Sequence, residues 1–299
     1  GVGKCIAEWI IDGEPSIDVW AMDVARFGDY ASPQYGTIKS SENYERRFIM
    51  TFPNETLPKG RKQKTTALYD RFVNQGAVMG DSFGLENVLW FANSKEDAHE
   101  EPTIKRSRSH DYVSREVINV RENVGLIEVA NFSKHEFKGT DARKFLDHVM
   151  AGKLPKPGRI SLSPMLSYRG KLCGDLTVAC FDENEFMVFG SGAAQEMHRR
   201  WFESHLDKFD VNYINRSDEF HGISIAGPNS RKVLEKIVRD DVTNAKFKFR
   251  DSRRMFVGGV PAIINRISFT GELGYEIYVA PHYQLKLYEE LMDAGREFN

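Results

Sequence analysis

Cysteines are few in this chain, and long apolar runs and an excess of one charge sign are missing from it. Its 299 residues include three cysteines, Cys5, Cys173 and Cys180, and no CxxC pair, which argues against a disulfide framework and a cysteine-rich zinc site. No apolar run approaches the roughly 20 residues that a membrane-spanning helix needs. The formal net charge is −2, whereas broad binding to nucleic-acid phosphates needs a basic excess. We therefore expect neither membrane nor nucleic acid as a partner.

An initiator methionine is also missing, since the chain begins Gly1-Val2-Gly3-Lys4. We expect the sequence to be an internal piece of a longer protein, whose targeting signal, if any, lies outside it. Gly1 and Gly3 form a Gly-x-Gly that opens a helix, an arrangement that can hold a phosphate at the helix N-terminus. Because the full fingerprint and a preceding strand are absent, a plain turn into the helix is the alternative.

The composition and length of the chain predict two globular units. Hydrophobic residues make up 41% of the sequence and charged residues 28%, which is typical of folded proteins. At about 150 residues per domain, 299 residues suggest two domains. The most polar stretch runs from Ser94 to Asp111 and reads as a linker or exposed loop. We place the boundary there, with units at 1–105 and 106–299.

From Tyr112 onward, helical and strand patterns alternate. We expect strands at 128–138, 172–181, 186–189, 222–226, 255–257, 260–269 and 275–279, and helices at 114–123, 193–206 and 283–294 and after Asp141 and Pro228. This pattern predicts an α+β fold with mixed, mostly antiparallel sheets and packed helices. On the helix at 193–206, we expect His198 and His205 to be exposed and not to bind a metal, since no third ligand is evident.

Asp175 is the first candidate for chemistry. It begins a strand that is otherwise apolar or β-branched, and Gly174 directly precedes it. One interpretation is an edge aspartate that faces water. The other is a carboxylate in a cavity, where Gly174 lets a ligand approach and Asp175 takes a proton from a substrate nitrogen or stabilises its positive charge.

The second candidate is the segment TGELGYE at 270–276, which follows Phe269. Its glycines permit unusual backbone angles and close approach of a ligand. A carboxylate such as that of Glu276 can accept two parallel hydrogen bonds from an amidine-like ring edge such as that of a pterin, and Phe269 and Tyr275 offer stacking faces. A glycine-rich turn with solvated acids is the equally open alternative.

These residues carry a resemblance to a known family. From Val124 to the C-terminus, the chain resembles the folate-binding domain of the glycine-cleavage T-protein, an aminomethyltransferase, in the version fused to dimethylglycine and sarcosine dehydrogenases. The order and spacing of six stretches agree: GLIEV (125–129), KGTDA (138–142), RGKL (169–172), GSG (190–192), IAGP (225–228) and RISFTGELGYE (266–276).

The first hundred residues are similar to other parts of the same fused enzymes. Residues 1–15 look like the end of the FAD-dependent amine-oxidising domain, which makes Gly1 and Gly3 a remnant of its FAD site. Residues 26–27, 68–69 and 84–91 resemble the connector that follows. The resemblance implies a complete FAD-binding region upstream and more of the folate domain downstream.

The resemblance implies a coupled reaction. The flavin oxidises an N-methyl amine to an iminium, and tetrahydrofolate captures the one-carbon unit as methylene-tetrahydrofolate. Asp175 falls on the family's catalytic aspartate and Glu276 on its pterin-recognising glutamate. The remaining positions that the resemblance assigns to the folate pocket are Phe132, Leu162, Phe269 and Tyr275. The implied compartment is the bacterial cytoplasm or the mitochondrial matrix.

The chain departs from the T-protein at several of these positions. The T-protein's double aspartate is Gly174-Asp175 here, its Asp-Val-Ser-His-Met segment is EVANF (128–132), and Leu162 replaces a pocket tyrosine. The flavin-linked dehydrogenases vary at the same places. The alternatives are a stand-alone T-protein-like aminomethyltransferase or demethylase, and a non-enzymatic regulatory relative that keeps the fold; the presence of Asp175 and Glu276 favours an enzyme.

Overall fold

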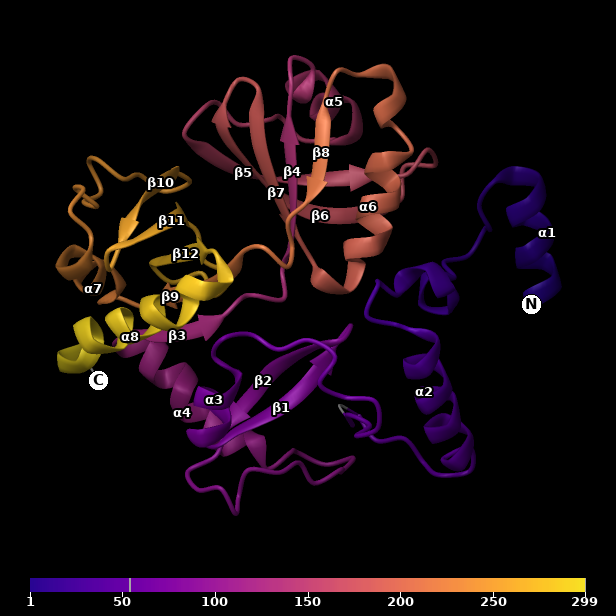
Figure 1. The fold of residues 1–299 in the computed structure, drawn as a ribbon, viewed down its shortest axis with the longest axis horizontal. Coiled ribbons are helices and arrows are strands. Elements are labelled where there is room, and N and C mark those ends of the chain that lie inside the picture. Colours follow the sequence, from indigo (N-terminus) through magenta and orange to yellow (C-terminus); the bar gives the residue numbers. More distant parts are fainter. Residues whose placement is uncertain (54, 299) are drawn as a thin grey trace.

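The computed structural model describes residues 1–53 and 55–298. Its strands form two five-stranded antiparallel sheets and one hairpin (Figure 1). The first sheet, called here the β12 sheet, has the order β10 (Ser252–Val257), β11 (Val260–Asn265), β12 (Gly274–Val279), β9 (His221–Ala226) and β3 (Gly125–Glu128). The second, called the β6 sheet, has the order β5 (Arg159–Leu166), β6 (Leu172–Asp182), β7 (Glu185–Gly190), β4 (Ser133–Lys138) and β8 (Asn212–Asn215). The hairpin joins β1 (Ala77–Ser82) and β2 (Leu85–Phe91).

Eight α-helices accompany these strands in the described part of the chain. They are α1 (Val2–Asp12), α2 (Pro33–Glu45), α3 (Tyr69–Asn74), α4 (Ser109–Glu122), α5 (Ala142–Val149), α6 (Gln195–Glu203), α7 (Ser230–Ile237) and α8 (Gln284–Gly295). Among the described residues, no helix has both the length and the apolar character needed to cross a bilayer.

Each sheet is covered by helices on one face and meets the other sheet on the opposite face. Leu234 of α7 and Leu291 of α8 belong to the core on the outer face of the β12 sheet. Phe145 of α5 and Phe202 of α6 belong to the core on the outer face of the β6 sheet. A third core, called here the inter-sheet core, joins the two sheets through Val129, Ile160, Ala179, Met187, Phe189, Ile263 and Tyr278. Because strand residues alternate between faces, β11, β12, β6 and β7 each contribute to two of these cores.

Most of the predicted elements are confirmed. The helix after Asp141 is α5, the strands expected around the turn at 182–184 are β6 and β7, and Gly258 and Gly259 connect β10 and β11 with φ angles of 58° and 80°. Such angles favour glycine. The predicted α+β class with antiparallel pairing is confirmed as well.

Three predicted elements are wrong in extent. The strand expected at 128–138 is two strands, β3 and β4, in different sheets, because the chain turns where the Phe132 N–H donates to the Val129 carbonyl (3.3 Å). The strand expected to reach residue 269 ends at Asn265, whose carbonyl accepts from the Ile267 N–H (3.0 Å). The helix expected from residue 114 begins at Ser109, whose N–H donates to Ser107 Oγ (3.2 Å).

The expected exposure of His198 is also wrong. Its side chain is 2% exposed and lies beneath the β6 sheet, whereas His205 is half-buried. His198 faces the sheet because α6 turns Phe202, four residues later, into the same core. His198 therefore lies on the buried, otherwise apolar face of the helix.

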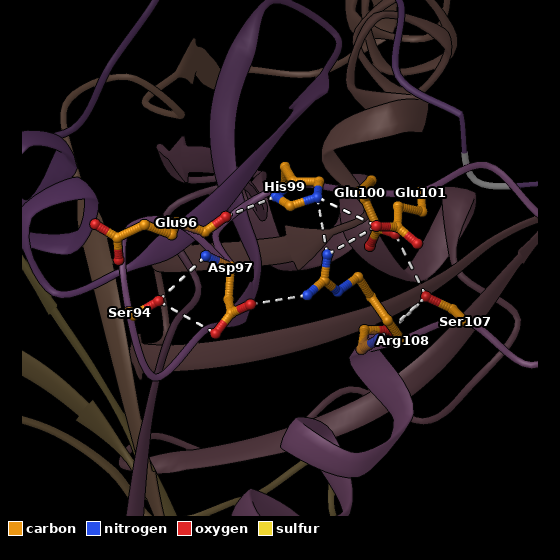
Figure 2. Close-up of polar contacts among 9 residues, drawn as sticks. Ser94, Glu96, Asp97, His99, Glu100, Glu101, Ser107 and Arg108 are labelled. Carbon is orange, nitrogen blue, oxygen red and sulfur yellow. Dashed lines mark hydrogen bonds and ion pairs between the residues drawn. The ribbon is translucent and has the colours of Figure 1, made fainter.

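The polar stretch at 94–111 is a loop followed by the start of α4, and its side chains bond to one another (Figure 2). Arg108 donates to Asp97 Oδ1 (3.0 Å) and to His99 Nε2 (2.8 Å). Glu100 accepts from Trp90 Nε1 of β2 (2.6 Å) and from Ser107 Oγ (3.3 Å). Because Trp90 is buried, these contacts fix the loop to β2 although its own side chains are polar.

The N-terminal part of the chain exposes many large apolar side chains. No residue of α1 is buried, and Ile10 and Ile11 are each about 80% exposed. Figure 1 shows α1 and α2 at the periphery, apart from both sheets. The α1 helix is the one that Gly1 and Gly3 are expected to open, and Gly13 ends it in a left-handed conformation with φ 79°.

Candidate functional site

A row of buried polar residues crosses the β12 sheet on the face that meets the β6 sheet. Strand pairing places Ser252 opposite Asn265, Asn265 opposite Glu276, and Glu276 opposite Ser224. All four residues are 6% exposed or less. The neighbouring row contains Ile263 and Tyr278 of the inter-sheet core. A polar row beside an apolar one is a means of fixing the orientation of a ligand.

Glu276 is the acidic member of this row. Tyr278 lies two residues later on the same face of β12 and donates from its hydroxyl to Glu276 Oε2 at 2.9 Å. Tyr278 stacks on Phe189 of the β6 sheet, with ring centroids 4.6 Å apart. Burial raises the pKa of Glu276 to about 7, and the Tyr278 hydrogen bond opposes that rise. The carboxyl group therefore changes its charge near neutral pH.

Asn265 adds an unused donor beside Glu276. Ser252 Oγ donates to Asn265 Oδ1 at 2.7 Å, which fixes the orientation of the amide. The amide nitrogen Nδ2 is buried and has no partner among the described residues. Buried polar groups are normally hydrogen-bonded, so an unpaired donor indicates a missing ligand or water. Together Glu276 and Asn265 present an acceptor and a donor side by side.

Asp175 lies on the sheet that faces this row. Along β6, Asp175, Thr177 and Ala179 share one face, and Ala179 belongs to the inter-sheet core. Asp175 is exposed, and within the described chain its carboxylate makes no hydrogen bond or ion pair. Leu162 of β5 is paired with Thr177 and is 64% exposed. Both side chains therefore continue the inter-sheet face from its core toward solvent.

The structure brings some of the predicted site residues together. Glu276 lies in the polar row, Phe132 is half-buried against the inter-sheet core, and Asp175 and Leu162 lie on the facing strands. Phe269 is in the segment between β11 and β12, and its ring is 95% exposed.

Tyr275, in contrast, does not lie on the face of the β12 sheet that carries the polar row. Adjacent residues of a strand point to opposite faces, so Tyr275 points away from Glu276. It is fully buried in the core with α7, accepts from Arg231 Nε at 3.1 Å and stacks on Phe247. The expected stacking role of Tyr275 is thereby corrected.

Gly1 and Gly3 stand at the N-terminus of the 11-residue α1, and both are exposed. A Cβ atom added to either residue would meet nothing within 4 Å. The two glycines therefore lie in open surroundings and do not form an enclosed phosphate-binding loop. They are also distant in sequence from the residues between the two sheets.

Sequence reasoning missed several residues of the site. Tyr278 could have been found, because it is two residues from Glu276 in an expected strand. Lys134 could not, since a lysine is normally exposed. Lys134 is fully buried, donates from Nζ to the carbonyls of Ala130 (2.7 Å) and Ser217 (3.3 Å), and lies over the Tyr278 ring at 5.8 Å. Burial lowers its pKa to about 7.

A separate groove of about 880 Å³ lies between the N-terminal segment and α6. Trp20 and Trp201 line it, and the indole nitrogen of each is buried without a partner among the described residues. Cys173, two residues before Asp175, lines the same groove. Within residues 1–53 and 55–298, no group of three or more histidine, cysteine or acidic side chains is placed to hold a metal ion.

Comparisons with known proteins place the chain among two families. The family model of the GCVT N-terminal domain matches residues 68–299, and that of the FAD dependent oxidoreductase central domain matches residues 12–66. The aminomethyltransferase T of the glycine cleavage system from Bartonella henselae is similar in structure, with a TM-score of 0.64 and 21% identity over 77% of this chain and 57% of that one. This likeness establishes the fold.

Three curated relatives are similar over almost the whole chain. Mitochondrial dimethylglycine dehydrogenase from Mus musculus is 35% identical over 99% of this chain and 34% of its own length. Mitochondrial sarcosine dehydrogenase from Homo sapiens is 26% identical over 99% of this chain and 37% of its own length. The mitochondrial pyruvate dehydrogenase phosphatase regulatory subunit from Mus musculus is 27% identical over 100% of this chain and 35% of its own length. The chain thus spans about a third of the length of these relatives.

Proposed function

Because the chain belongs to the GCVT N-terminal domain family, we propose that it is the folate-binding part of a flavin-dependent N-methylglycine dehydrogenase. It passes the one-carbon unit of an iminium, formed from an N-methyl amine such as dimethylglycine or sarcosine, to tetrahydrofolate and so gives methylene-tetrahydrofolate. Two relatives are a dimethylglycine dehydrogenase and a sarcosine dehydrogenase, which supports this substrate class. Mitochondrial relatives support the mitochondrial matrix as the compartment, and the bacterial cytoplasm is the alternative.

The buried pair of Glu276 and Asn265 is the observation that carries this proposal. A carboxylate can accept two parallel hydrogen bonds from the ring N–H and amino group of a pterin. The unpaired Asn265 Nδ2 can donate to a ring acceptor beside them. Phe132 lies against the inter-sheet core and Leu162 lies on the sheet that faces Glu276, so both offer apolar contacts to a ligand between the two sheets. The residues present therefore fit a pterin, and Phe269 offers an exposed stacking face in the same region.

Asp175 is the proposed catalytic residue. Tetrahydrofolate, when bound, supplies the nitrogen nucleophile that accepts the one-carbon unit. The Asp175 carboxylate lies on the inter-sheet face without a competing partner. It is therefore available to take the proton that this nitrogen releases, or to stabilise positive charge on it. Glu276 orients the ring, while Asp175 acts at the reacting atom.

We propose a different role for the front of the chain. Residues 1–53 and 55–66 contain no β-strand of a dinucleotide-binding fold, and Gly1 and Gly3 offer FAD only the N-terminus of α1. FAD supplies the two-electron oxidation of the amine, and we assign its binding to other parts of a longer protein. The exposed apolar side chains of α1 are suited to pack against such a part. We retain 1–105 and 106–299 as the proposed units.

A non-enzymatic regulatory role is the second candidate. The relative that supports it is the phosphatase regulatory subunit, whose similarity extends over the whole chain. The two roles differ in one respect that can be measured, since only the enzyme needs Asp175 for turnover.

Tetrahydrofolate binding to the intact protein tests the proposal. Calorimetry should show binding, and Glu276→Gln should weaken it at least about tenfold, as loss of a charge-assisted pair would. Glu272→Gln is the matched control, because Glu272 is a carboxylate of the same segment that lies outside the polar row. Absence of tetrahydrofolate binding, or equal effects of the two substitutions, would overturn the proposed site.

A further inference from the structure

The strand that carries Asp175 is supported by a neighbouring strand on one side only. The last pair between β6 and β7 is Thr177 with Phe189, so Asp175 lies beyond it. On the other side β5 stays paired, but the residue opposite Asp175 is Pro164, which has no N–H, and the Pro164 carbonyl accepts from Ala151 (2.8 Å). Contacts other than the strand ladder can therefore influence where Asp175 lies.

His198 of α6 supplies such a contact from behind the strand. Its Nε2 lies 3.3 Å from the carbonyl oxygen of Cys173. A carbonyl only accepts, so Nε2 carries the proton and donates to Cys173. Burial lowers the pKa of His198 to about 4, which keeps the ring neutral at physiological pH. Its Nδ1 is then a buried acceptor without a partner among the described residues.

Gly174 lies directly against the ring of this histidine. A Cβ atom on Gly174 would lie 2.7 Å from His198 Nε2, which is closer than real Cβ contacts allow, and 3.4 Å from Cδ2 of the same ring. The φ angle of Gly174 is not in the left-handed region. The absence of a side chain is thus explained by the His198 ring and not by backbone conformation.

We infer that His198 is a positioning residue for Asp175, acting through the Cys173 carbonyl and the Gly174 backbone. This inference rests on the proposed function of Asp175. The ring touches the two residues that directly precede Asp175, from the face opposite to its carboxylate. It thereby sets the position of the strand where β7 no longer pairs with it, and with it the position of the carboxylate relative to the polar row on β12.

The test compares His198→Leu with His198→Gln in the intact protein. Leucine removes the donor to Cys173, whereas glutamine retains an amide N–H near the position of Nε2. We expect His198→Leu to slow folate-coupled formation of methylene-tetrahydrofolate about tenfold, with a tetrahydrofolate Kd within about twofold of the original protein. His198→Gln should recover most of the rate. His205→Leu, on the same helix, should leave both quantities unchanged.

A double-mutant cycle keeps the inference testable if His198→Leu does not fold. Gly174→Ala should slow transfer about tenfold because its Cβ meets the ring. In a His198→Ala background the same substitution should cost much less, since the ring is gone. Additive effects of the two substitutions, or an unchanged transfer rate in His198→Leu, would overturn the positioning role.

The same assay separates this inference from the proposed function. Asp175→Asn should slow transfer in the original background. If it does not, the catalytic role of Asp175 fails whatever His198 does. If Asp175→Asn slows transfer but neither His198→Leu nor Gly174→Ala does, only the positioning role fails.

Discussion

Tyr278 donates a hydrogen bond to Glu276 within a single strand, with 2.9 Å between the hydroxyl oxygen and Oε2. Both side chains are buried between the two sheets, and Tyr278 also stacks on Phe189 of the facing sheet. Burial raises the pKa of Glu276 to about 7 and that of Tyr278 well above its usual range. The hydroxyl therefore stays a donor, while the carboxyl group can switch between neutral and charged forms at neutral pH.

The first prediction concerns the pH dependence of tetrahydrofolate binding. Recognition of the pterin edge needs the carboxylate form of Glu276, so affinity should rise as pH increases from about 6 to 8 and level off above that range. Tyr278→Phe removes a hydrogen bond that favours the carboxylate, so it should move the midpoint to higher pH. Calorimetric titrations at several pH values measure both effects.

A flat profile would contradict this assignment of Glu276. The control is Glu276→Gln, which cannot ionise and should bind weakly at every pH. If the Gln variant keeps the pH dependence of the original protein, another group is responsible for it.

The second prediction is that Asp175→Asn slows transfer without weakening binding. The carboxylate is exposed and unpaired in the described chain, so its loss should change the free energy of unfolding by less than about 0.5 kcal/mol. Removal of a general base typically lowers the rate about 10²-fold or more. Single-turnover formation of methylene-tetrahydrofolate, measured beside the tetrahydrofolate Kd, checks the separation. A parallel loss of both quantities would contradict a purely catalytic role.

The third prediction concerns how two buried groups, Glu276 and Lys134, each contribute to stability as pH changes. The folded-state pKa of Glu276 is about 7, above its ordinary value of 4.5, so the folded state holds the extra proton and stability falls as pH rises from 4.5 to 7. The folded-state pKa of Lys134 is about 7, below its ordinary 10.5, so the unfolded state holds the extra proton and stability rises from pH 7 to 10.5.

Each contribution has a slope of at most about 1.4 kcal/mol per pH unit. Buried histidines such as His135 and His198, whose pKa values are lowered, add slopes of their own, so each group is isolated by comparing a variant with the original protein. Glu276→Gln should remove the contribution that falls between pH 4.5 and 7, and Lys134→Met should remove the one that rises between pH 7 and 10.5. Urea unfolding between pH 4.5 and 10 measures the difference between each variant and the original protein. If the difference for either variant does not change with pH, the corresponding group is not the buried titrating one.

The sequence predicted the fold well where its patterns were local. The helix containing Phe145 and Leu146 has its apolar residues at helical spacing, and the β10–β11 turn has the Gly-Gly that its backbone needs. The error at 128–138 arose because β3 ends at Glu128 and β4 begins at Ser133, while the turn between them at Val129 to Phe132 contains neither glycine nor proline. Only the pairing of each half with a different sheet distinguishes them.

The candidate site was predictable in part. Glu276 and Asp175 were found through the family resemblance, and the alternation of β12 could have excluded Tyr275 and included Tyr278. The Asn265 and Lys134 contributions could not be foreseen, since both depend on which strands are neighbours in space. His198 was misjudged for the same reason, because its burial is set by the contact of α6 with Gly174 and Cys173.

The last prediction concerns Gly192, the final residue of the GSG stretch. A Cβ there would lie 1.9 Å from the carbonyl oxygen of Asn131, in the turn that carries the chain from β3 to β4. Backbone atoms cannot yield as a side chain can, so Gly192→Ala should destabilise the protein by about 3 kcal/mol. Gly271→Ala is the control: its Cβ would meet open space, and its φ of 82° should cost about 1 kcal/mol. Urea unfolding compares the two. Because Asn131 adjoins Phe132, Gly192→Ala should also weaken tetrahydrofolate binding, and equal costs for both variants would show that the turn does not need this close approach.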